Sequence, residues 1–388
     1  MIHMQLTEGQ RKAIEAVNEF ADKYFDEESI RQWCHSMGIP SYVYDAFYES
    51  PLGGYVLSKN AGGYDCPFLD RVTMLIEVTR RAGATLPFSS DMNSLAMFST
   101  LRKLSQEEIV QEYAYTDGRI RFSQAFTEPN AGTDAQAVRA QISTDPDGIY
   151  LDGVKTFVSC GQFSPQTLVL ARDPIYGQRD GGMSMWLVPI NIEGVSTFPI
   201  NTVGQEMLCP AAISFKHVKL KPSWQIQTEG KLNSMLKRQY GLGRILVCAS
   251  SVGLALAAMD DAVAYAAEHE VKGRRLNSLP QIQEKLTDME IKIRAMRMFV
   301  RDAAVAADER GSDFMLETAL MKRFVPGAAT EVASEALQIF GGVGYTDATR
   351  VSRIWQDCRG NQIAQGTDEV MAGIAAKGIT QRAQSREF

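Results

Sequence analysis

A run of apolar residues near the C-terminal end alternates steps of four and three positions, and it constrains the fold more than any other stretch. The run consists of Ile282, Leu286, Met289, Ile293, Met296, Val300 and Ala303. Such a/d spacing is typical of a helix packed in a bundle of near-parallel neighbours. A further helix is predicted over 314–340, with a kink at Pro326-Gly327 because proline removes one backbone hydrogen bond. The chain is therefore predicted to be helical from about residue 230 to its end.

The rest of the chain carries two other patterns. Thr7 and Gln10 have the spacing of a capping box and open a run with helical periodicity, and further helices are predicted over 68–84 and 92–113. From about Arg119 short alternating runs appear, and the Asp147-Gly148 pair between two of them predicts an antiparallel hairpin. Because 388 residues exceed one ordinary core, three domains are expected. The fold class is multidomain α+β, with a helical domain over 1–118, an antiparallel β-barrel or sandwich over 119–229 and a helical bundle over 230–388.

Composition excludes several classes of protein. A net charge of −6 argues against nonspecific nucleic-acid binding, which needs a basic stripe. The first ten residues lack the features of a secretory signal, and the longest apolar stretch, 245–259, is too short to span a bilayer. We expect a buried helix there and no membrane insertion.

The 6 cysteines lie far apart from one another and the 4 histidines are scattered, with no C-x-x-C pair and no zinc-ligand spacing. Reduced thiols of a cytoplasmic protein are the expectation, and no metal site is predicted.

Two strings in the predicted β region could carry chemistry. In "FTEPNAGTDA", residues 126–135, an open backbone and the hydroxyls of Thr127 and Thr133 could converge on a phosphate or a polar ring edge, although an ordinary turn has the same composition. In "VKTFVSCG", residues 154–161, strand periodicity places Phe157 and Ser159 on one side, which by itself is also typical of a buried strand.

Two strings in the C-terminal helices complete the set. "ALQIFGGVGYT", residues 336–346, ends a helix at paired glycines, which could cap the helix or permit close approach to a dinucleotide. "RVSRIWQDCRGNQIAQGTDEV", residues 350–370, leads from an Arg-rich turn to Gln365, Gly366 and Thr367.

In this order and at these distances the four strings resemble the acyl-CoA dehydrogenase flavoprotein family, over essentially the whole chain. The "LTEGQ" start and the "GGYDCPF" loop add to the resemblance, and "RVSRIWQDCR" and "PQIQEKLTDMEIKI" resemble the branch containing crotonobetainyl-CoA reductase. The resemblance implies a C-terminal four-helix bundle, FAD in each subunit and a homotetramer built as a dimer of dimers. It also implies an acyl-CoA thioester substrate, an electron-transferring flavoprotein as partner, and a place in fatty acid or carnitine metabolism.

The resemblance also assigns site residues. Arg244 matches the arginine that helps to hold the acyl-CoA, and Gln365 stands at the position of the catalytic base. The residues expected to contact FAD are Gln124, Phe126, Thr127, Gly132, Thr133, Phe157, Ser159, Gln338, Gly341, Gly342 and Thr367. Among these, Gln338, Gly341 and Gly342 would approach the adenine portion of a partner subunit's FAD.

Three positions depart from the family pattern. Most members carry the glutamate that removes the α-proton where this chain has Gln365, and some carry it at the position of Gly243. A neutral carboxamide has no useful basicity, so Asp368 and Glu369 are the nearest candidates for a replacement. His269 stands where members have an arginine on the FAD pyrophosphate, and Lys272, Arg274 or Arg275 could compensate.

Three functional hypotheses follow. The leading one is an FAD-dependent acyl-CoA dehydrogenase or enoyl-CoA reductase with a displaced base. The second is an altered family member that binds acyl-CoA, or joins an electron-transferring flavoprotein complex, without dehydrogenating. The third is a structural subunit without flavin. Neither the acyl chain nor the direction of the reaction in the cell follows from the sequence.

Overall fold

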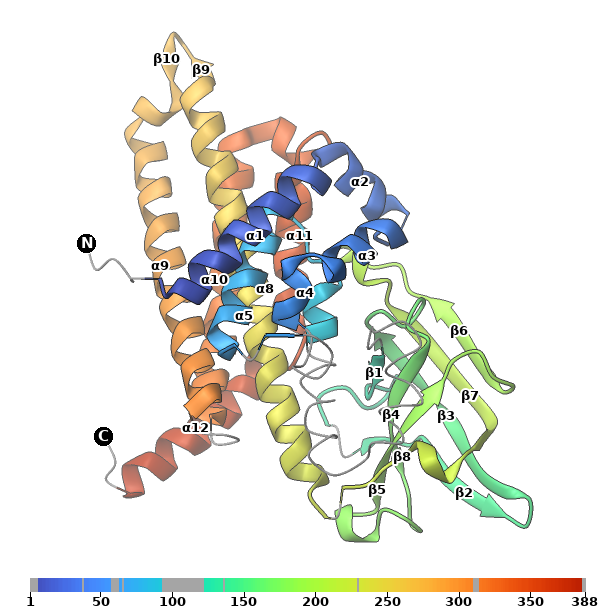
Figure 1. Ribbon diagram of the computed structural model, residues 1–388. Helices are drawn as coiled ribbons and strands as arrows, with labels where there is room; N and C mark the ends of the chain where they lie inside the picture. Colours follow the sequence, from blue (N-terminus) through green and yellow to red (C-terminus); the bar gives the residue numbers. More distant parts are fainter. Residues whose placement is uncertain are drawn as a thin grey trace. The chain divides into compact units, whose positions relative to one another are not determined.

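The computed structural model describes residues 6–36, 38–56, 63–64, 66–92, 122–134, 137–228, 230–309 and 314–385. The chain forms two compact units (Figure 1). The helical unit comprises Met1–Ser89, Val203–Gln205 and Tyr240–Phe388, and the β unit comprises Ser90–Thr202 and Glu206–Gln239. The two helical regions of the sequence thus share one unit. The domain boundaries at 118 and 229 stay a prediction.

Two of the helices before residue 90, the one that begins after Thr7 and the one within 68–84, form where the sequence predicts them. Thr7 and Gln10 make both hydrogen bonds of the capping box at the start of α1, and Asp26 caps α2 by accepting from Ser29 N. The helix predicted over 92–113 lies outside the described residues. The described helices of this part are α1 Glu8–Tyr24, α2 Glu27–His35, α3 Ser41–Glu49, α4 Pro51–Val56 and α5 Phe68–Ala82.

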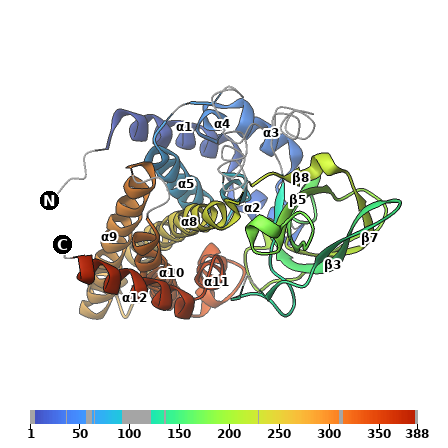
Figure 2. The ribbon, with the colours of Figure 1, turned by 90° about the horizontal axis from the view of Figure 1, so that it is seen from below.

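The C-terminal region contains long helices, several of which run side by side (Figure 2). They are α8 Leu232–Glu268, α9 Pro280–Glu309, α10 Met315–Phe340, α11 Arg350–Ile363 and α12 Asp368–Ser385, with the short strands β9 Glu270–Val271 and β10 Arg274–Arg275 between α8 and α9. The predicted a/d run is confirmed, since five of its seven residues are buried on α9 and the other two are half-buried. α10 continues as one helix through the buried Pro326.

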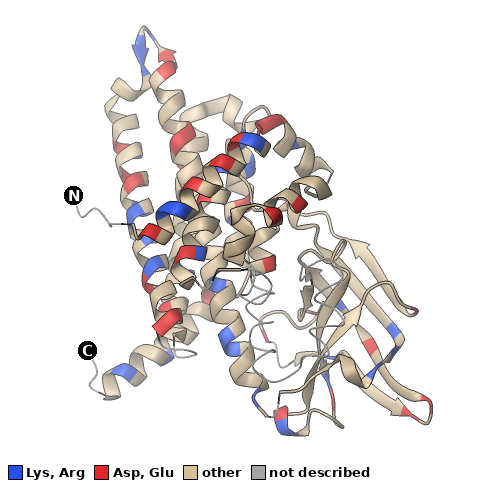
Figure 3. Cartoon of the chain, in the orientation of Figure 1, with Lys and Arg blue, Asp and Glu red and all other residues tan. Residues whose placement is uncertain are grey.

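Charged residues of both signs lie along the outer face of α9 (Figure 3). Lys285 on α9 pairs with Glu335 on α10, and Lys292 Nζ lies 2.7 Å from Glu331. These pairs link the two helices on the side away from the a/d core.

A buried carboxylate joins three distant segments of the helical unit. Asp357 on α11 is 2% exposed and accepts hydrogen bonds from Thr85 N at 2.6 Å and Gln205 N at 2.5 Å. Gln205, with φ of 59°, also donates from Nε2 to Asn361 Oδ1 at 2.6 Å. Burial raises the pKa of Asp357, although these donors act against the shift.

The β unit is one sheet whose strands follow the order β6-β7-β3-β2-β4-β5-β8, with β1 beside β4. Its strands are β1 Ser123–Ala125, β2 Gln141–Asp145, β3 Gly148–Val158, β4 Gln166–Arg172, β5 Met183–Pro189, β6 Val195–Pro199, β7 Ala211–Leu220 and β8 Gln225–Ile226. The predicted hairpin is confirmed by the β2–β3 pairing that ends at Asp145 and Gly148. The sheet is mixed rather than purely antiparallel, because β4 pairs in parallel with both β1 and β2. Its core includes Trp186, Phe215 and Trp224.

One described helix, α8, is long and apolar enough to cross a membrane by length and composition. However, 83% of its most apolar window is buried inside the structure, as expected for a core helix. None of the six cysteines, all of which lie within the described residues, forms a disulfide. Among the described residues, no group of three or more His, Cys, Asp or Glu side chains could hold a metal ion.

Candidate active site

A buried ion pair shapes the loop that carries the first motif. Glu128 and Lys155 are 6% and 0% exposed, and Lys155 Nζ lies 2.8 Å from Glu128 Oε1. The same carboxylate accepts from the backbone N–H groups of Arg139 at 2.6 Å and Ala140 at 2.9 Å, and Lys155 also donates to Phe126 O at 3.1 Å. Burial alone would raise the pKa of Glu128, but these donors outweigh it and hold the pKa below its usual range. The carboxylate is therefore ionised and fixes the loop from inside.

The outer side of this loop is open. Thr127 O accepts from Thr156 N at 2.9 Å, which joins the loop to β3. Around Gly132, an added Cβ would meet only Thr127 Cγ2, at 4.0 Å, and Thr133 is exposed. The loop can therefore receive a ligand on the side that carries Gly132 and Thr133.

Gln124 on β1 supplies a buried hydrogen-bond donor without an acceptor. Its Nε2 is inaccessible to solvent and has no hydrogen-bond partner within the described part of the chain. An unpaired buried amide costs about 1 to 3 kcal/mol, so such groups are normally satisfied. A polar ring edge placed against β1 would supply the missing acceptor.

Phe157 stands on a strained bulge of β3. The pairing of β3 with β7 shifts between Lys155 and Val158, and Phe157 has φ of 52° with its side chain 65% exposed. A bulky residue at positive φ is costly and is typical of functional positions. The bulge turns Lys155 inward and Phe157 outward, although strict strand alternation would place both on one face. Ser159 is half-buried.

Substituting Phe157→Gly tests the role of this ring. Glycine adopts positive φ without steric cost, so the stability of the apoprotein should stay constant or rise by up to about 1 kcal/mol. Loss of a stacked ring should raise the FAD dissociation constant roughly 3- to 10-fold, which flavin fluorescence titration measures. As a control, Phe198→Ala removes a ring on β6 that is 56% exposed and should leave FAD affinity unchanged. Equal FAD affinity in Phe157→Gly and the wild type would remove Phe157 from the flavin site.

The paired glycines after α10 lie on the surface of the helical unit. Gly341 has φ of 65°, and its N–H bonds to Gln338 O and Leu337 O, so it caps the helix. A Cβ added at Gly341 or Gly342 would meet no atom within 4 Å, and Gln338 is exposed. Gly341 therefore caps the helix and also leaves the backbone accessible. The structure is compatible with both predicted roles of the glycines, as a helix cap and as a place where a dinucleotide can approach closely.

A stack of three rings adjoins these glycines. Tyr265 stacks on Phe340 at 4.2 Å and on His269 at 4.8 Å between ring centroids. An open surface cavity of about 380 Å³ lies beside the stack and is lined in part by Tyr265, Glu268 and Phe340. The β9–β10 hairpin after His269 carries Lys272, Arg274 and Arg275, all exposed, where Figure 3 shows basic residues.

Gln365 lies in a left-handed turn between α11 and α12. Its φ is 56° and that of Gly366 is 103°. The carbonyl oxygen of Gln365 accepts from Arg244 Nε at 3.3 Å, and that of Gly366 accepts from Lys322 Nζ at 3.2 Å. The structure thus brings together Arg244, which the resemblance assigned to substrate binding, and Gln365, which stands at the position of the catalytic base.

Arg244 is a buried cation. It is 5% exposed, and its Nη1 lies 4.0 Å from the sulfur of Met315. Burial lowers its pKa to about 10, with Tyr240 and Cys248 acting against the shift. Arg244 is still fully charged at neutral pH.

The two acids after the turn are differently placed. Asp368 Oδ2 accepts from Gln362 Nε2 at 2.8 Å and lies 3.4 Å from Arg323 Nη1, whereas its Oδ1 is buried and no described residue bonds to it. Glu369 is exposed, and hydrogen bonds at the start of α12 hold its pKa below the usual value. Gly243 is buried on α8. Asp368 is therefore the better placed of the two candidate bases.

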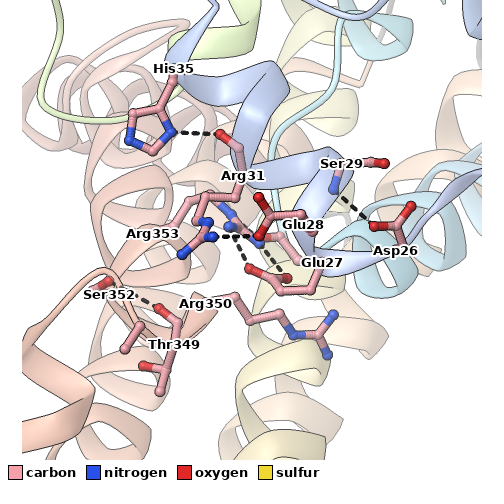
Figure 4. A network of polar contacts seen from close by, with 12 residues as sticks. Asp26, Glu27, Glu28, Ser29, Arg31, His35, Thr349, Arg350, Ser352 and Arg353 are labelled. Carbon is pink, nitrogen blue, oxygen red and sulfur yellow. Dashed lines mark hydrogen bonds and ion pairs between the residues drawn. The ribbon is translucent and has the colours of Figure 1, made fainter.

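The arginines of the fourth motif stabilise the fold. Figure 4 shows Arg353 with both terminal nitrogens on the carboxylate of Glu27, at 2.9 and 3.0 Å. Arg350 binds Asp261 through two contacts of 2.8 Å. The segment is the start of α11 rather than an Arg-rich turn.

Three residues of this region were missed by sequence reasoning: Glu128, Lys155 and Lys322. Glu128 and Lys155 stand inside two of the quoted strings, and a lysine in an otherwise apolar strand was a usable signal. Lys322 gave no signal, because its partners lie 40 and 44 positions along the chain.

Comparison with known proteins identifies the fold and the family. Two family models match the sequence: "Acyl-CoA dehydrogenase, middle domain" over residues 123–218 and "Acyl-CoA dehydrogenase, C-terminal domain" over residues 233–380. The solved structure of an acyl-CoA dehydrogenase from Slackia heliotrinireducens DSM 20476 is 36% identical, with 99% of this chain and 100% of that chain covered and a TM-score of 0.85.

Two further relatives also match over nearly their full length. The probable acyl-CoA dehydrogenase YdiO of Escherichia coli strain K12 is 29% identical over 383 residues, which are 98% of this chain and 99% of YdiO. A structure described as an electron transferring flavoprotein of Acidaminococcus fermentans is 26% identical, covers 97% of this chain and 99% of that chain, and has a TM-score of 0.87.

Fold and matches together define a flavin oxidoreductase that acts on CH–CH bonds. The chain belongs to the acyl-CoA dehydrogenase family, whose members use FAD. The predicted helical, β and helical order of the fold is thereby confirmed. The residues of the β unit fit this cofactor, because Gln124 lacks an acceptor, Gly132 is open and Phe157 is exposed. The individual roles of the FAD-contacting residues stay predictions.

Proposed function

We propose that this chain oxidises or reduces the α,β C–C bond of an acyl-CoA thioester with a proton-transfer group that differs from the family's usual glutamate. The observation that carries the proposal is the contact between Arg244 Nε and the carbonyl of Gln365, at 3.3 Å. Since a buried cation is costly, an arginine buried against this turn supports a role in holding a polar ligand beside residue 365.

FAD, when bound, accepts or returns the hydride at the β-carbon. Gln365 cannot remove the α-proton, but its amide can donate or accept a hydrogen bond at that position. Asp368, three positions after Gln365 in the sequence, is a half-buried carboxylate whose Oδ1 has no hydrogen-bond partner among the described residues. We propose Asp368 as the replacement base or, in the reductive direction, as the acid.

The alternative is an altered member that binds acyl-CoA, or joins an electron-transferring flavoprotein complex, without dehydrogenating. The observation that favours it is that Asp368 is already engaged by Gln362 and Arg323. A carboxylate held in this way is less free to move a proton.

Anaerobic titration of the FAD-loaded protein with acyl-CoA thioesters of increasing chain length tests the proposal. Bleaching of the flavin absorbance by at least one saturated thioester, or reoxidation of reduced flavin by an enoyl-CoA, is the expected result. Thioester binding without either change would instead establish the alternative. A protein that takes up no FAD from excess cofactor would be the structural subunit.

We further propose a homotetramer built as a dimer of dimers. In support, α9 exposes Ile291 and Met298 at 60% and 65%, and Phe299 contacts Phe324 of α10 with ring centroids 5.2 Å apart. An exposed apolar group of this kind is typical of a surface covered by another copy.

Its cellular setting is also part of the proposal. We propose an electron-transferring flavoprotein as redox partner, supported by the match to the Acidaminococcus fermentans structure. The strings shared with the crotonobetainyl-CoA reductase branch support a role in carnitine metabolism, and the six free cysteines support a cytoplasmic location.

A further inference from the structure

Lys322 is the feature of the helical unit that proton transfer and cofactor binding leave unexplained. Its side chain is fully buried on α10, and its Nζ donates to the carbonyl oxygens of Gln362 and Gly366, each at 3.2 Å. Within the described chain, these two carbonyls are its complete set of hydrogen-bond partners.

The charge of Lys322 has no counter-ion in direct contact among the described residues. The nearby Asp368 contacts Gln362 and Arg323 instead, and burial raises the pKa of the Cys248 thiol to about 12, so the thiol is neutral. Burial accordingly lowers the pKa of Lys322. The equally buried Lys155 differs, because its ammonium faces the carboxylate of Glu128.

An uncompensated buried ammonium costs stability, and an apolar side chain of similar length would avoid that cost. The contacts of Lys322 must therefore supply something that methionine could not. Both of its acceptors belong to the segment that presents Gln365.

The backbone of this segment needs external support. α11 ends at Ile363 and leaves its last carbonyl groups without intrahelical partners, and α12 begins at Asp368. Between the helices Gln365 and Gly366 both have positive φ, which for Gln365 is a strained conformation. Lys322 holds one carbonyl on each side of Gln365, while Arg244 holds the carbonyl of Gln365 itself.

We propose that Lys322 is a positioning residue that fixes the left-handed turn at Gln365–Gly366 and thereby aims residue 365 at the substrate. The link to substrate rests on the proposed function, whereas the effect on the turn does not. Lys322 takes no part in proton transfer, and it acts through two backbone carbonyls.

Amide hydrogen exchange of the FAD-loaded protein measures directly how well the turn at Gln365–Gly366 is held. Lys322→Met keeps the apolar stem but removes both donors, so amides between residues 362 and 371 should exchange about tenfold faster or more, the expected effect of losing hydrogen bonds to a charged donor. Lys322→Gln, which keeps an amide donor, should give an intermediate rate and provides a second variant if the methionine protein folds poorly. Lys292→Met removes a half-exposed lysine that pairs with Glu331 of the same α10 and should leave these amides unchanged.

A double-mutant cycle links the turn to chemistry. The flavin-reduction rate is measured with one saturated acyl-CoA in the wild type, Gln365→Glu, Lys322→Met and the double variant. Positioning predicts that most of the gain from a carboxylate at 365 disappears without Lys322, whereas a purely structural lysine leaves the fold-gain the same in both backgrounds.

The outcomes separate the two proposals. Unchanged exchange at residues 362–371 in both Lys322 variants overturns the positioning role, whatever the enzyme does. An equal fold-gain in the cycle overturns it as well. Faster exchange in a protein that no thioester reduces would support the role in the turn while rejecting the proposed reaction.

Discussion

Replacing Gln365 by glutamate is expected to raise the rate of flavin reduction by a saturated acyl-CoA by roughly 10² to 10⁴, the range typical of a general acid or base. The two side chains have nearly the same shape, so the left-handed turn and the contact from Arg244 should persist. Two buried cations, Arg244 and Lys322, hold the turn and favour an ionised carboxylate there. Single-turnover reduction of bound FAD under anaerobic conditions measures the effect without an electron acceptor.

A neutral control separates charge from packing. Gln365→Asn keeps an amide at this position and should show no gain. If Gln365→Glu binds FAD and thioester but its flavin is reduced no faster than that of the wild type, two explanations remain. The flavin-reduction rate of the wild type distinguishes them. A fast wild type would show that another group, with Asp368 the first candidate, already serves as the base; a wild type without turnover would show that the scaffold serves different chemistry.

Breaking the Glu128–Lys155 ion pair beneath the loop that carries Gly132 is expected to cost about 3 to 5 kcal/mol of unfolding free energy, because one charge is left buried without its partner. Glu128→Leu leaves the ammonium of Lys155 buried without a counter-ion, and Lys155→Met leaves the carboxylate of Glu128, which is 6% exposed, without one. Both variants should also lose FAD, since the carboxylate fixes the backbone at Arg139 and Ala140. Chemical denaturation gives the stability, and gel filtration followed by flavin absorbance gives the retained cofactor.

The pH dependence has a definite sign. The pKa of Glu128 lies below its usual value in the folded protein, so its contribution is complete above the unfolded pKa near 4.5 and is lost as the pH falls through the folded value. The stability difference between the wild type and Glu128→Leu should therefore shrink in acid below that pH.

The double variant provides the matched comparison. Glu128→Leu with Lys155→Met removes both charges and should recover much of the lost stability, because apolar replacement of a buried ion pair is often neutral. It should not recover FAD, because the two backbone donors stay unpaired. A control at the half-exposed Lys292–Glu331 pair should cost about 0.5 kcal/mol or less. A double variant as unstable as the sum of the single variants would contradict the ion-pair explanation.

Local patterns predicted much of the fold. The a/d run of α9, the capping box of α1 and the hairpin at Gly148 all depend on residues a few positions apart, so the local sequence is enough to predict them. Motif order assigned Arg244 and Gln365, and the structure places them in contact. The parallel pairing of β1 and β2 with β4 was not predictable in this way, because parallel neighbours are set by the sheet as a whole.

The buried lysines that hold the site's loops, Lys155 and Lys322, could not be predicted for a related reason. Strand alternation puts Lys155 and Phe157 on one face, and only the bulge in β3 separates them. Lys322 sits among apolar neighbours on α10, and its role depends on a turn formed more than 35 positions later. Likewise, Arg350 and Arg353 suggested an Arg-rich turn, but they form ion pairs with Asp261 and Glu27.

The carboxylate of Asp357 has a consequence for attempts to divide this protein. Of its two backbone donors, Thr85 precedes the β unit in the sequence, whereas Gln205 belongs to the short segment Val203–Gln205, which is part of the helical unit although the chain on both sides of it is not. A shortened gene that joins residue 89 to residue 240 would therefore omit one of the two donors and leave a buried acid half satisfied. The helical unit is thus built from three separate stretches of polypeptide, and a version expressed alone would need a substitute for Asp357 as well as a new linker.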